Sequence, residues 1–181
     1  EPDRVPLGTK RMPKKQVYHF LLGDPGMCSY SDKVIKQLEP ANIKLMKDWN
    51  KKFTSPVTDD EVVTLLRLSA AIDELWEAQI QLRKEVNAKT QDSLSIFGYT
   101  DDAVDSHTTI RQKDKIFSEL YKTEHMKNAG PYARLKFAMD YWCALWFWPI
   151  DKADLLPTRS EFLFDMSLIL EGTMASVNVT D

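Results

Sequence analysis

Between residues 58 and 90 the apolar positions of the chain recur every three or four residues, which is the spacing of one face of an α-helix. Thr58 and Glu61 begin this run with the sequence of a capping box, in which each side chain bonds the backbone N–H of the other residue. The pattern predicts a single helix of about 30 residues, roughly 45 Å long. Because such a helix extends beyond a small core, we expect it to pack as an antiparallel hairpin or to project towards a partner.

The other helical patterns are shorter and are separated by residues that begin or end helices. Pro40 suits the first position of a helix, where its missing N–H leaves no bond unmade, and Gly172 suits the position after a last turn. A second capping box, Thr158 with Glu161, begins the last helix. These helices are predicted at 29–53 (two helices), 108–126, 131–148 and 155–172. The expected fold is mainly α, with about six helices including the long one at 58–90.

Prolines and glycines punctuate the first 30 residues, which favours an extended arm. The stretch QVYHFLL at 16–22 is rich in β-branched and aromatic residues and fits one short strand. The predicted organisation is an arm at 1–30, a helical domain at 31–172 and a tail at 173–181. Within the domain, acids and small polar residues at 91–107 predict a connecting loop.

Three of the five tryptophans lie in one stretch of ten residues, DYWCALWFWP at 140–149. A membrane-spanning helix needs about 20 apolar residues, and acidic residues bracket a much shorter run here. A platform for stacking nucleic-acid bases usually places exposed rings beside basic residues, whereas the local charge is acidic. We therefore expect a central helix enclosed by its neighbours, with Trp142 stacked on Trp146 and Pro149 ending the helix.

The composition fits an ordinary globular chain. Its 181 residues suffice for one domain with an arm, and 43% hydrophobic and 28% charged residues are typical of such a protein. A formal net charge of −3 gives no overall basic field to attract nucleic acid. Cys28 and Cys143 have no metal-binding spacing, so we expect two reduced thiols in a cytoplasmic protein with no membrane segment.

The sequence lacks the common motifs of catalysis and cofactor binding: GxSxG, GxxxxGK[ST], HExxH, CxxC and GxGxxG. DPGM at 24–27 is similar to the catalytic tetrapeptide of amino-methyltransferases. Gly26 and Met27, however, replace its second proline and the aromatic residue that stacks the target base. We interpret DPGM as a turn. The aspartates around the tryptophan helix leave a less favoured alternative, a small hydrolase or ligand-binding enzyme with paired carboxylates.

Basic residues are concentrated in two places. The arm has five basic residues and no acid between residues 4 and 15, and the predicted helix that begins at Pro40 carries lysines whose spacing puts them on one face. The candidates for contacts with DNA phosphates are Arg4, Lys10, Arg11, Lys14, Lys15, Lys44, Lys47 and Lys51. A solvated surface is the competing interpretation for both sets.

Three blocks of sequence, in fixed order, carry a resemblance to a known family. They are VPLGTKRMPKKQVYHFLLGDPGM (5–27), LLRLSAAIDELWE (65–77) and MDYWCALWFWPIDKADLLPTRSEFLFDMSLILEG (139–172). The blocks resemble a region of very large bacterial DNA methyltransferases of restriction-modification and phage-defence systems. The resemblance covers most of the chain. It implies a parent enzyme of Class I that uses S-adenosylmethionine to methylate adenine N6.

The glycine-rich cofactor motif and the NPP-aromatic catalytic motif of that family do not occur in this sequence. The resemblance therefore assigns no catalytic, cofactor-binding or metal-binding residue to this chain, and S-adenosylmethionine would bind elsewhere in the parent. It implies a non-catalytic helical segment that acts as a scaffold, covers the DNA cleft or joins domains. Its partners would be the remainder of the methyltransferase and DNA. The alternative is a free-standing helical domain for protein–protein interaction.

Overall fold

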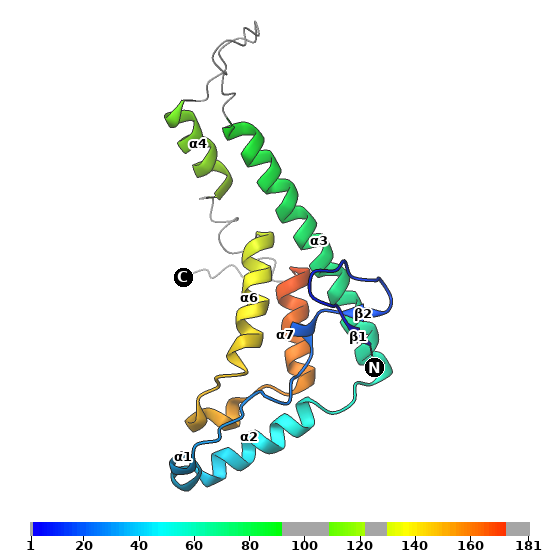
Figure 1. Ribbon diagram of the computed structural model, residues 1–181, viewed down its shortest axis with the longest axis vertical. Helices are drawn as coiled ribbons and strands as arrows, with labels where there is room; N and C mark the ends of the chain where they lie inside the picture. Colours follow the sequence, from blue (N-terminus) through cyan, green and yellow to red (C-terminus); the bar gives the residue numbers. More distant parts are fainter. Residues whose placement is uncertain (1, 92–108, 122–129, 173–181) are drawn as a thin grey trace, which may run out of the picture.

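The computed structural model describes residues 2–91, 109–121 and 130–172, and within them the fold is mainly helical, as predicted (Figure 1). The α-helices are α1 (Lys33–Leu38), α2 (Pro40–Phe53), α3 (Asp59–Thr90), α4 (Ile110–Tyr121), α6 (Pro131–Ala144) and α7 (Arg159–Glu171). The other described elements are the strands β1 (Asp3–Arg4) and β2 (Gln16–Val17) and the 3-10 helices η1 (His19–Leu21) and η2 (Ile150–Leu155). Of the predicted segments, the connection beyond Gln91, residues 122–126 and the tail at 173–181 lie outside the described residues.

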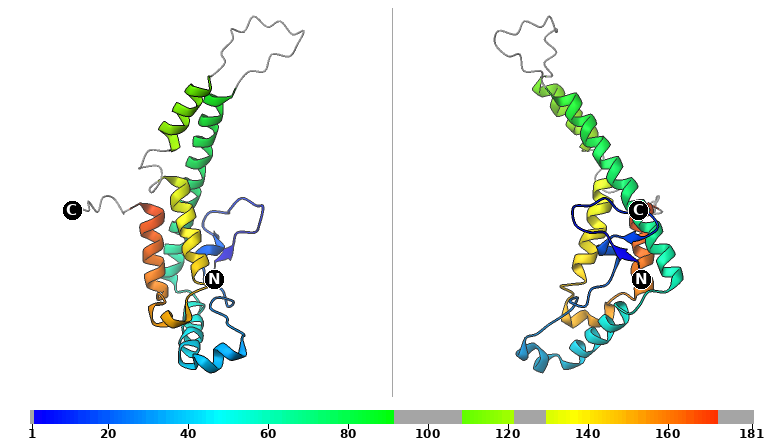
Figure 2. Two further views of the ribbon diagram at one scale, coloured as in Figure 1. Left: turned by 90° about the vertical axis from the view of Figure 1, so that its left-hand side faces the viewer. Right: turned by 45° about the vertical axis from the view of Figure 1, so that its right-hand side comes forward.

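The long helix α3 begins and ends as the sequence predicts. Its capping box is formed: the Thr58 hydroxyl accepts the Glu61 N–H at 3.3 Å, and the Glu61 carboxylate accepts the Thr58 N–H at 2.8 Å. The N-terminal half of α3 packs against α6 and α7, while its C-terminal half projects beyond them with α4 antiparallel alongside (Figures 1 and 2). The hairpin and the projection that the length of this helix predicts are both present.

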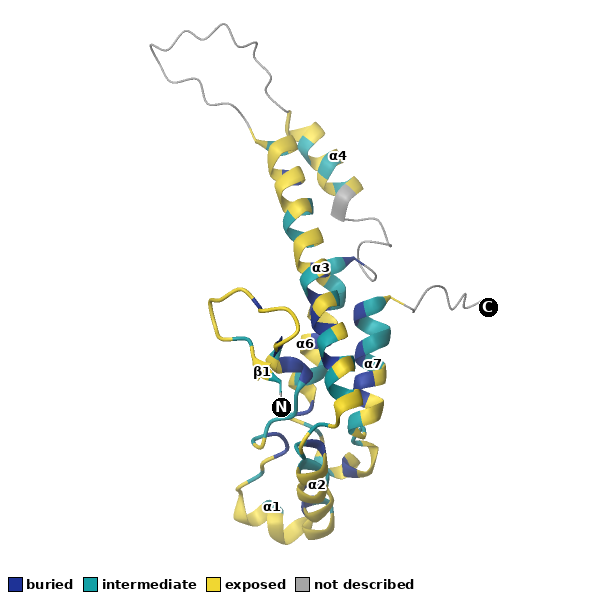
Figure 3. Cartoon of the chain, turned by 90° about the vertical axis from the view of Figure 1, so that its right-hand side faces the viewer, coloured by how far each residue is buried: buried dark blue, intermediate teal, exposed yellow. Residues whose placement is uncertain are grey.

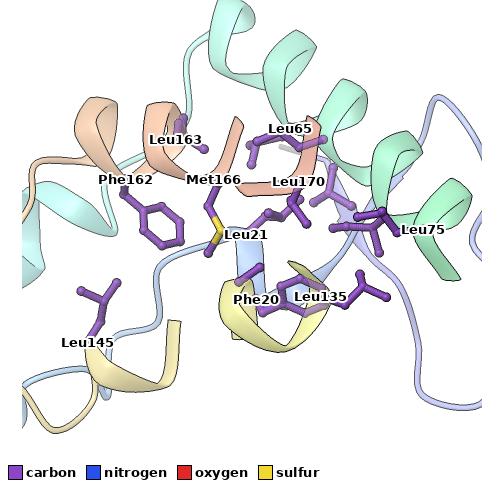
Figure 4. Close-up of a cluster of buried hydrophobic side chains, with 14 of the residues drawn as sticks. Phe20, Leu21, Leu65, Leu75, Leu135, Leu145, Phe162, Leu163, Met166 and Leu170 are labelled. Carbon is purple, nitrogen blue, oxygen red and sulfur yellow. The ribbon is translucent and has the colours of Figure 1, made fainter. Parts of the chain in front are cut away.

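The core lies where α3, α6 and α7 meet the first part of the chain (Figure 4). Leu65 and Leu68 of α3 and Phe162 and Met166 of α7 are at most 1% exposed. Leu21 of η1 points into the same cluster. Because burial of apolar surface contributes about 25 cal/mol per Å², burial of these side chains stabilises the packing of the helices on the arm.

The predicted strand at 16–22 is shorter than expected. β1 and β2 pair in parallel, Asp3 with Gln16 and Arg4 with Val17. The chain then turns, because the Leu21 N–H bonds the Tyr18 carbonyl at 3.1 Å and begins η1. This turn brings two consecutive residues of η1 into the core, which a strand with alternating side chains cannot do.

The stretch at 140–149 does not form the predicted continuous helix. α6 ends at Ala144, and each of the next three N–H groups bonds the carbonyl three residues earlier, as in a 3-10 helix. Pro149 disfavours the helical conformation of Trp148, the residue before it, but α6 has already ended four residues before Trp148. The last two tryptophans therefore lie in a connection that leads to η2, and the prediction that Pro149 ends this helix is wrong.

The prediction that α6 is enclosed by its neighbours is wrong. Leu135 and Ala138 are the buried residues of α6, while Tyr132, Phe137 and Met139 are 61%, 60% and 41% exposed. α3, α7 and η1 contact the helix. Apolar residues on the remaining sides have the same periodicity as the buried ones, so the sequence pattern alone does not distinguish the covered face from the open one.

The tryptophans of this stretch nevertheless have structural contacts. Trp142 and Trp146 are in contact, with ring centroids 5.5 Å apart, but the rings meet edge-on at an interplanar angle of 65° rather than stacked as predicted. The indole N–H of Trp142 donates to the Leu22 carbonyl at 2.9 Å, and that of Trp148 donates to the Lys152 carbonyl at 2.8 Å. All three rings pack against the core, which agrees with the interpretation as core rather than as a base-stacking platform.

α2 lies across the end of the molecule opposite the projecting hairpin (Figure 1). It packs on η2 around Met46 and Ala153, beside the buried thiol of Cys28. Cys28 and Cys143 are both free. α1 precedes α2 and has no buried residue (Figure 3). None of the described helices combines the length and the apolar character that a membrane span requires.

Candidate nucleic-acid interface

The lysines of α2 form a row that faces solvent. Lys44, Lys47 and Lys51 are exposed, whereas Ile43 and Met46 on another face of the helix are buried. Spacings of three and four residues place the three lysines along one side over about 10 Å. The row is anchored, because the indole N–H of Trp49, in the same helix, donates to the Pro157 carbonyl at 2.7 Å. We call Lys44, Lys47 and Lys51 the lysine row.

Further lysines lie near the lysine row. Residues 31–53, which include α1 and α2, contain six lysines and three acids, although the whole chain carries a net charge of −3. The six are Lys33, Lys36, Lys44, Lys47, Lys51 and Lys52. Lys33 and Lys36 are exposed on α1 and were not among the candidates. The spacing of three residues between Lys33 and Lys36 was the feature of the sequence that could have identified them as further basic candidates. The basic end of the molecule is therefore larger than predicted.

The basic residues of the arm differ in their surroundings. Lys10, Lys14 and Lys15 are exposed. Arg4 is half exposed; it donates to the Gly23 carbonyl at 3.3 Å and lies 3.7 Å from the Asp24 carboxylate. These four side chains remain accessible to a phosphate.

Arg11 is placed differently from the other predicted contacts, because its side chain is 4% exposed. Its Nε donates to Asp73 at 2.8 Å, and its Nη1 donates to the Gln16 carbonyl at 3.2 Å. The Tyr18 hydroxyl donates to the same carboxylate at 2.7 Å. Burial, reinforced by this bond to Asp73, raises the pKa of Tyr18 to about 12. Arg11 thus anchors the arm to α3, and the candidate phosphate contacts reduce to the other seven residues.

The structure does not bring the two basic sets together. The loop with Lys10, Lys14 and Lys15 lies beside α3, near Asp73, whereas the lysine row lies on α2 at the end of the molecule (Figures 1 and 2). The chain therefore offers two separate basic regions, and the lysine row is the one carried on a helix.

DPGM forms a turn, as predicted. The Asp24 carboxylate accepts the Gly26 N–H at 2.8 Å, and the Asp24 carbonyl accepts the Met27 N–H at 3.0 Å. A Cβ at Gly26 would lie 2.8 Å from the Trp146 ring, so this glycine permits close packing of the turn on the aromatic stretch. Its role in the fold is structural.

The aspartates near α6 have separate surroundings. Asp165 accepts the Tyr141 hydroxyl at 2.9 Å; burial and this bond raise the pKa of Tyr141. Asp140 pairs with Lys136, one turn earlier on the same helix. Asp151 and Asp154 are exposed. These contacts suit structural and solvated carboxylates rather than an acid/base pair. Within residues 2–91, 109–121 and 130–172, no group of three or more histidine, cysteine or acidic side chains is arranged to hold a metal ion.

No protein-family model matches the chain, and no curated protein or solved structure is significantly similar to it. The function of the chain is therefore inferred from its own residues and from the resemblance of the three sequence blocks.

Proposed function

We propose that this chain is a non-catalytic helical module of a larger bacterial DNA methyltransferase of the restriction-modification or phage-defence type, and that its lysine row contacts the DNA backbone. The DNA contact is inferred from the anchored lysine row on α2. The row places three exposed lysines on one helix face, within a basic region of a chain that is acidic overall. One DNA strand presents a phosphate every 3.4 Å of axial rise, so about 10 Å of helix face spans about three phosphates. The parent enzyme is cytoplasmic in this proposal.

The module has no part in the methyl transfer. It supports or joins the catalytic parts of the parent chain, which hold S-adenosylmethionine and the target adenine. Phosphate contacts of this kind position a protein on DNA without reading the base sequence. Recognition of the target sequence therefore belongs to the rest of the parent enzyme.

We expect the 181-residue chain to bind duplex DNA weakly and in a strongly salt-dependent manner. Each phosphate contact contributes about −0.9 to the slope of log K against log salt concentration. Replacing Lys44, Lys47 and Lys51 together with glutamine should reduce that slope by about 3 units. Fluorescence anisotropy of a labelled duplex, titrated at several salt concentrations, measures this slope for each variant.

The matched control replaces three lysines of the projecting hairpin, Lys84, Lys89 and Lys115, with glutamine. It makes the same change in net charge, yet it should leave the slope nearly unaltered because these side chains lie on α3 and α4. Equal losses in the two triple variants would show a general charge effect and would contradict a contact by the lysine row.

The proposal also predicts that the isolated chain does not bind S-adenosylmethionine. The sequence contains no glycine-rich cofactor motif. We expect isothermal titration calorimetry to detect no binding, with the whole parent enzyme as the positive control. A dissociation constant in the micromolar range for the 181-residue chain would contradict the non-catalytic role.

The second candidate is a protein–protein interaction domain, and the projecting hairpin favours it. The C-terminal part of α3 extends beyond the core, and Trp76 near the start of this part is 56% exposed. A genomic reading frame that starts and stops near residues 1 and 181 would support this candidate. A frame that continues through a methyltransferase would support the first.

A further inference from the structure

Residues 5–15 join β1 to β2 and form a loop that lies beside α3 (Figures 1 and 3). We call this segment the basic loop. It contains no acidic residue. Leu7 and Met12 of the loop are 95% and 57% exposed. Its exposed basic side chains are those of Lys10, Lys14 and Lys15. The basic loop thus presents positive charge together with apolar surface.

The base of the basic loop is fixed by buried polar residues. Arg11 and Gln16 are 7% and 6% exposed. The Gln16 side chain accepts the Met12 N–H at 2.8 Å, and the Met12 carbonyl accepts the Gln16 N–H at 3.2 Å. These bonds close the chain around Lys14, whose φ of 68° is a left-handed conformation that lysine rarely adopts. Such a conformation persists only where the surrounding contacts impose it. The loop therefore has its shape before a partner arrives, which reduces the entropy that binding must overcome.

The arm is attached to one face of α3, and this face continues into an exposed indole. Asp73 accepts a hydrogen bond from the Arg11 Nε at 2.8 Å. Ser69, four residues earlier in α3, accepts the Tyr18 N–H at 3.4 Å. Helix periodicity places Trp76, three residues after Asp73, on the same face. Because Trp76 is 56% exposed, its ring is available to a ligand on the face that carries the basic loop.

The acidic residues next to Trp76 do not share its direction. Glu77 and Glu74 are one and two residues away, which places them about 100° and 160° around the helix from Trp76. Asp73 is closer, about 60° around the helix, but its charge is balanced by the ion pair with Arg11. Repulsion of a phosphate by the carboxylates of α3 is therefore reduced on the side that carries the ring.

We propose that Trp76 and the basic loop bind single-stranded DNA, with one unpaired base stacked on the indole and the flanking phosphates on the lysines of the loop. An exposed ring beside basic residues is the usual arrangement of such sites, because every base has a face for stacking and every nucleotide carries a phosphate. The choice of DNA rests on the proposed function. The surface itself is separate from the lysine row, which lies on α2 at the end of the molecule (Figure 1).

The test uses the 181-residue chain and fluorescently labelled strands of about 12 nucleotides, within the usual size of a single-strand site. One strand is oligodeoxythymidylate; the other is an abasic strand that keeps the phosphates but has no bases. Fluorescence anisotropy at low salt measures both affinities. Trp76→Ala should weaken binding of the thymidylate at least about fivefold. It should leave the abasic strand within about twofold, because that probe has no base to stack.

Two outcomes of this measurement would overturn the proposal. Equal losses of affinity for the thymidylate and the abasic strand would show that Trp76 does not stack on a base. No saturable binding of the thymidylate would leave the exposed ring to the protein–protein interaction candidate. Far-UV circular dichroism of each variant checks that the fold is retained.

The matched controls change a ring without removing the stacking surface. Trp76→Phe keeps a ring at the same position and should retain the affinity for thymidylate within about threefold. Phe164→Ala removes a ring that is 63% exposed on α7, beside Asp60 and Glu61 rather than beside lysines. It should leave the affinity unchanged, and a loss as large as that of Trp76→Ala would contradict a specific role for Trp76.

The lysines are tested separately, and this test distinguishes the site from the lysine row. Each phosphate contact with a single strand contributes about −0.7 to the slope of log K against log salt concentration. Replacing the three lysines of the basic loop with glutamine should therefore reduce the slope for thymidylate by about 2 units. An unchanged slope would overturn the inference.

Binding of duplex DNA separates this inference from the proposed function. Trp76→Ala should leave the affinity for a duplex within about twofold, because the paired and stacked bases inside a duplex offer no free face to the ring. Replacing the lysine row should lower the salt slope for the duplex but should not abolish the effect of Trp76→Ala on the thymidylate. A lysine-row variant that leaves duplex binding unchanged would therefore contradict the proposed duplex contact alone.

Discussion

Replacing Phe162 with alanine should lower the free energy of unfolding by about 3–5 kcal/mol, the usual range for a buried phenylalanine. The side chain is fully buried at the centre of the core and contacts aromatic rings from two other helices. Its ring centroid lies 5.4 Å from that of Phe53 in α2 and 5.3 Å from that of Tyr141 in α6. The substitution therefore removes contacts that join three helices. Urea unfolding followed by far-UV circular dichroism measures the loss.

Phe164 supplies a control for this substitution on the same helix. It is 63% exposed, so Phe164→Ala removes the same atoms from a surface position and should change stability by no more than about 0.5 kcal/mol. Comparable losses of unfolding free energy in the two variants would mean that Phe162 is not on the side of α7 that packs into the core.

The helix ends were predictable because the residues that define them act locally. Thr158 and Glu161 fix the start of α7, since the Thr158 N–H bonds the Glu161 carboxylate at 2.7 Å. Gly172 fixes its end, because it adopts a left-handed conformation with φ of 70°. A contact between residues three apart can be read from sequence, and so can a conformation that glycine favours.

The packing of the arm was not predictable, because it depends on residues that are far apart in the sequence. Arg11 and Asp73 are separated by 62 positions, and their pairing converts a candidate phosphate contact into an anchor. Both residues also fit a solvated surface when the sequence is considered alone. The local sequence therefore predicted that residues 1–30 form an arm, but it did not predict that Arg11 of this arm is buried.

The lysine row was predictable for the same reason as the helix ends. Lys44, Lys47 and Lys51 share a face because of helix geometry alone, and the buried residues of α2 fix the direction of that face. The contacts of Arg159 with Glu61 and Ser55 were not predictable in this way, because they join segments 98 and 104 positions apart. Sequence can therefore identify a site on one helix more readily than a site between elements.

Arg159 is the residue at which local sequence rules fail most clearly, and replacing it should have a large effect. It occupies the first turn of α7, where the helix dipole disfavours a positive charge. The structure explains this placement: the Arg159 guanidinium donates to Glu61 at 2.7 and 2.9 Å and to the Ser55 carbonyl at 2.5 Å. It thereby ties the start of α7 to the capping box of α3, 98 positions away in the sequence.

Arg159→Met should lower the free energy of unfolding by about 2–4 kcal/mol at neutral pH. Methionine retains much of the apolar stem, but it leaves the Glu61 carboxylate without its cation and the Ser55 carbonyl without this donor. The control is Arg67→Met, because Arg67 pairs with Glu171 at a position where the arginine is 53% exposed. Exposed pairs contribute about 1 kcal/mol or less, so the control should lose much less stability.

The effect of Arg159→Met should also depend on pH. Burial alone would raise the pKa of Glu61, but hydrogen bonds from Thr58 and the Arg159 guanidinium together lower it. A carboxyl whose folded-state pKa is lowered contributes its stability above its unfolded-state pKa, about 4.3, and loses it as the pH falls through the folded-state value. The difference between wild type and Arg159→Met should therefore be largest near neutral pH and shrink below about pH 4. Urea unfolding at pH 7 and pH 3.5 tests this, and an unchanged difference at the lower pH would assign the effect of Arg159 to its carbonyl contacts rather than to its pair with Glu61.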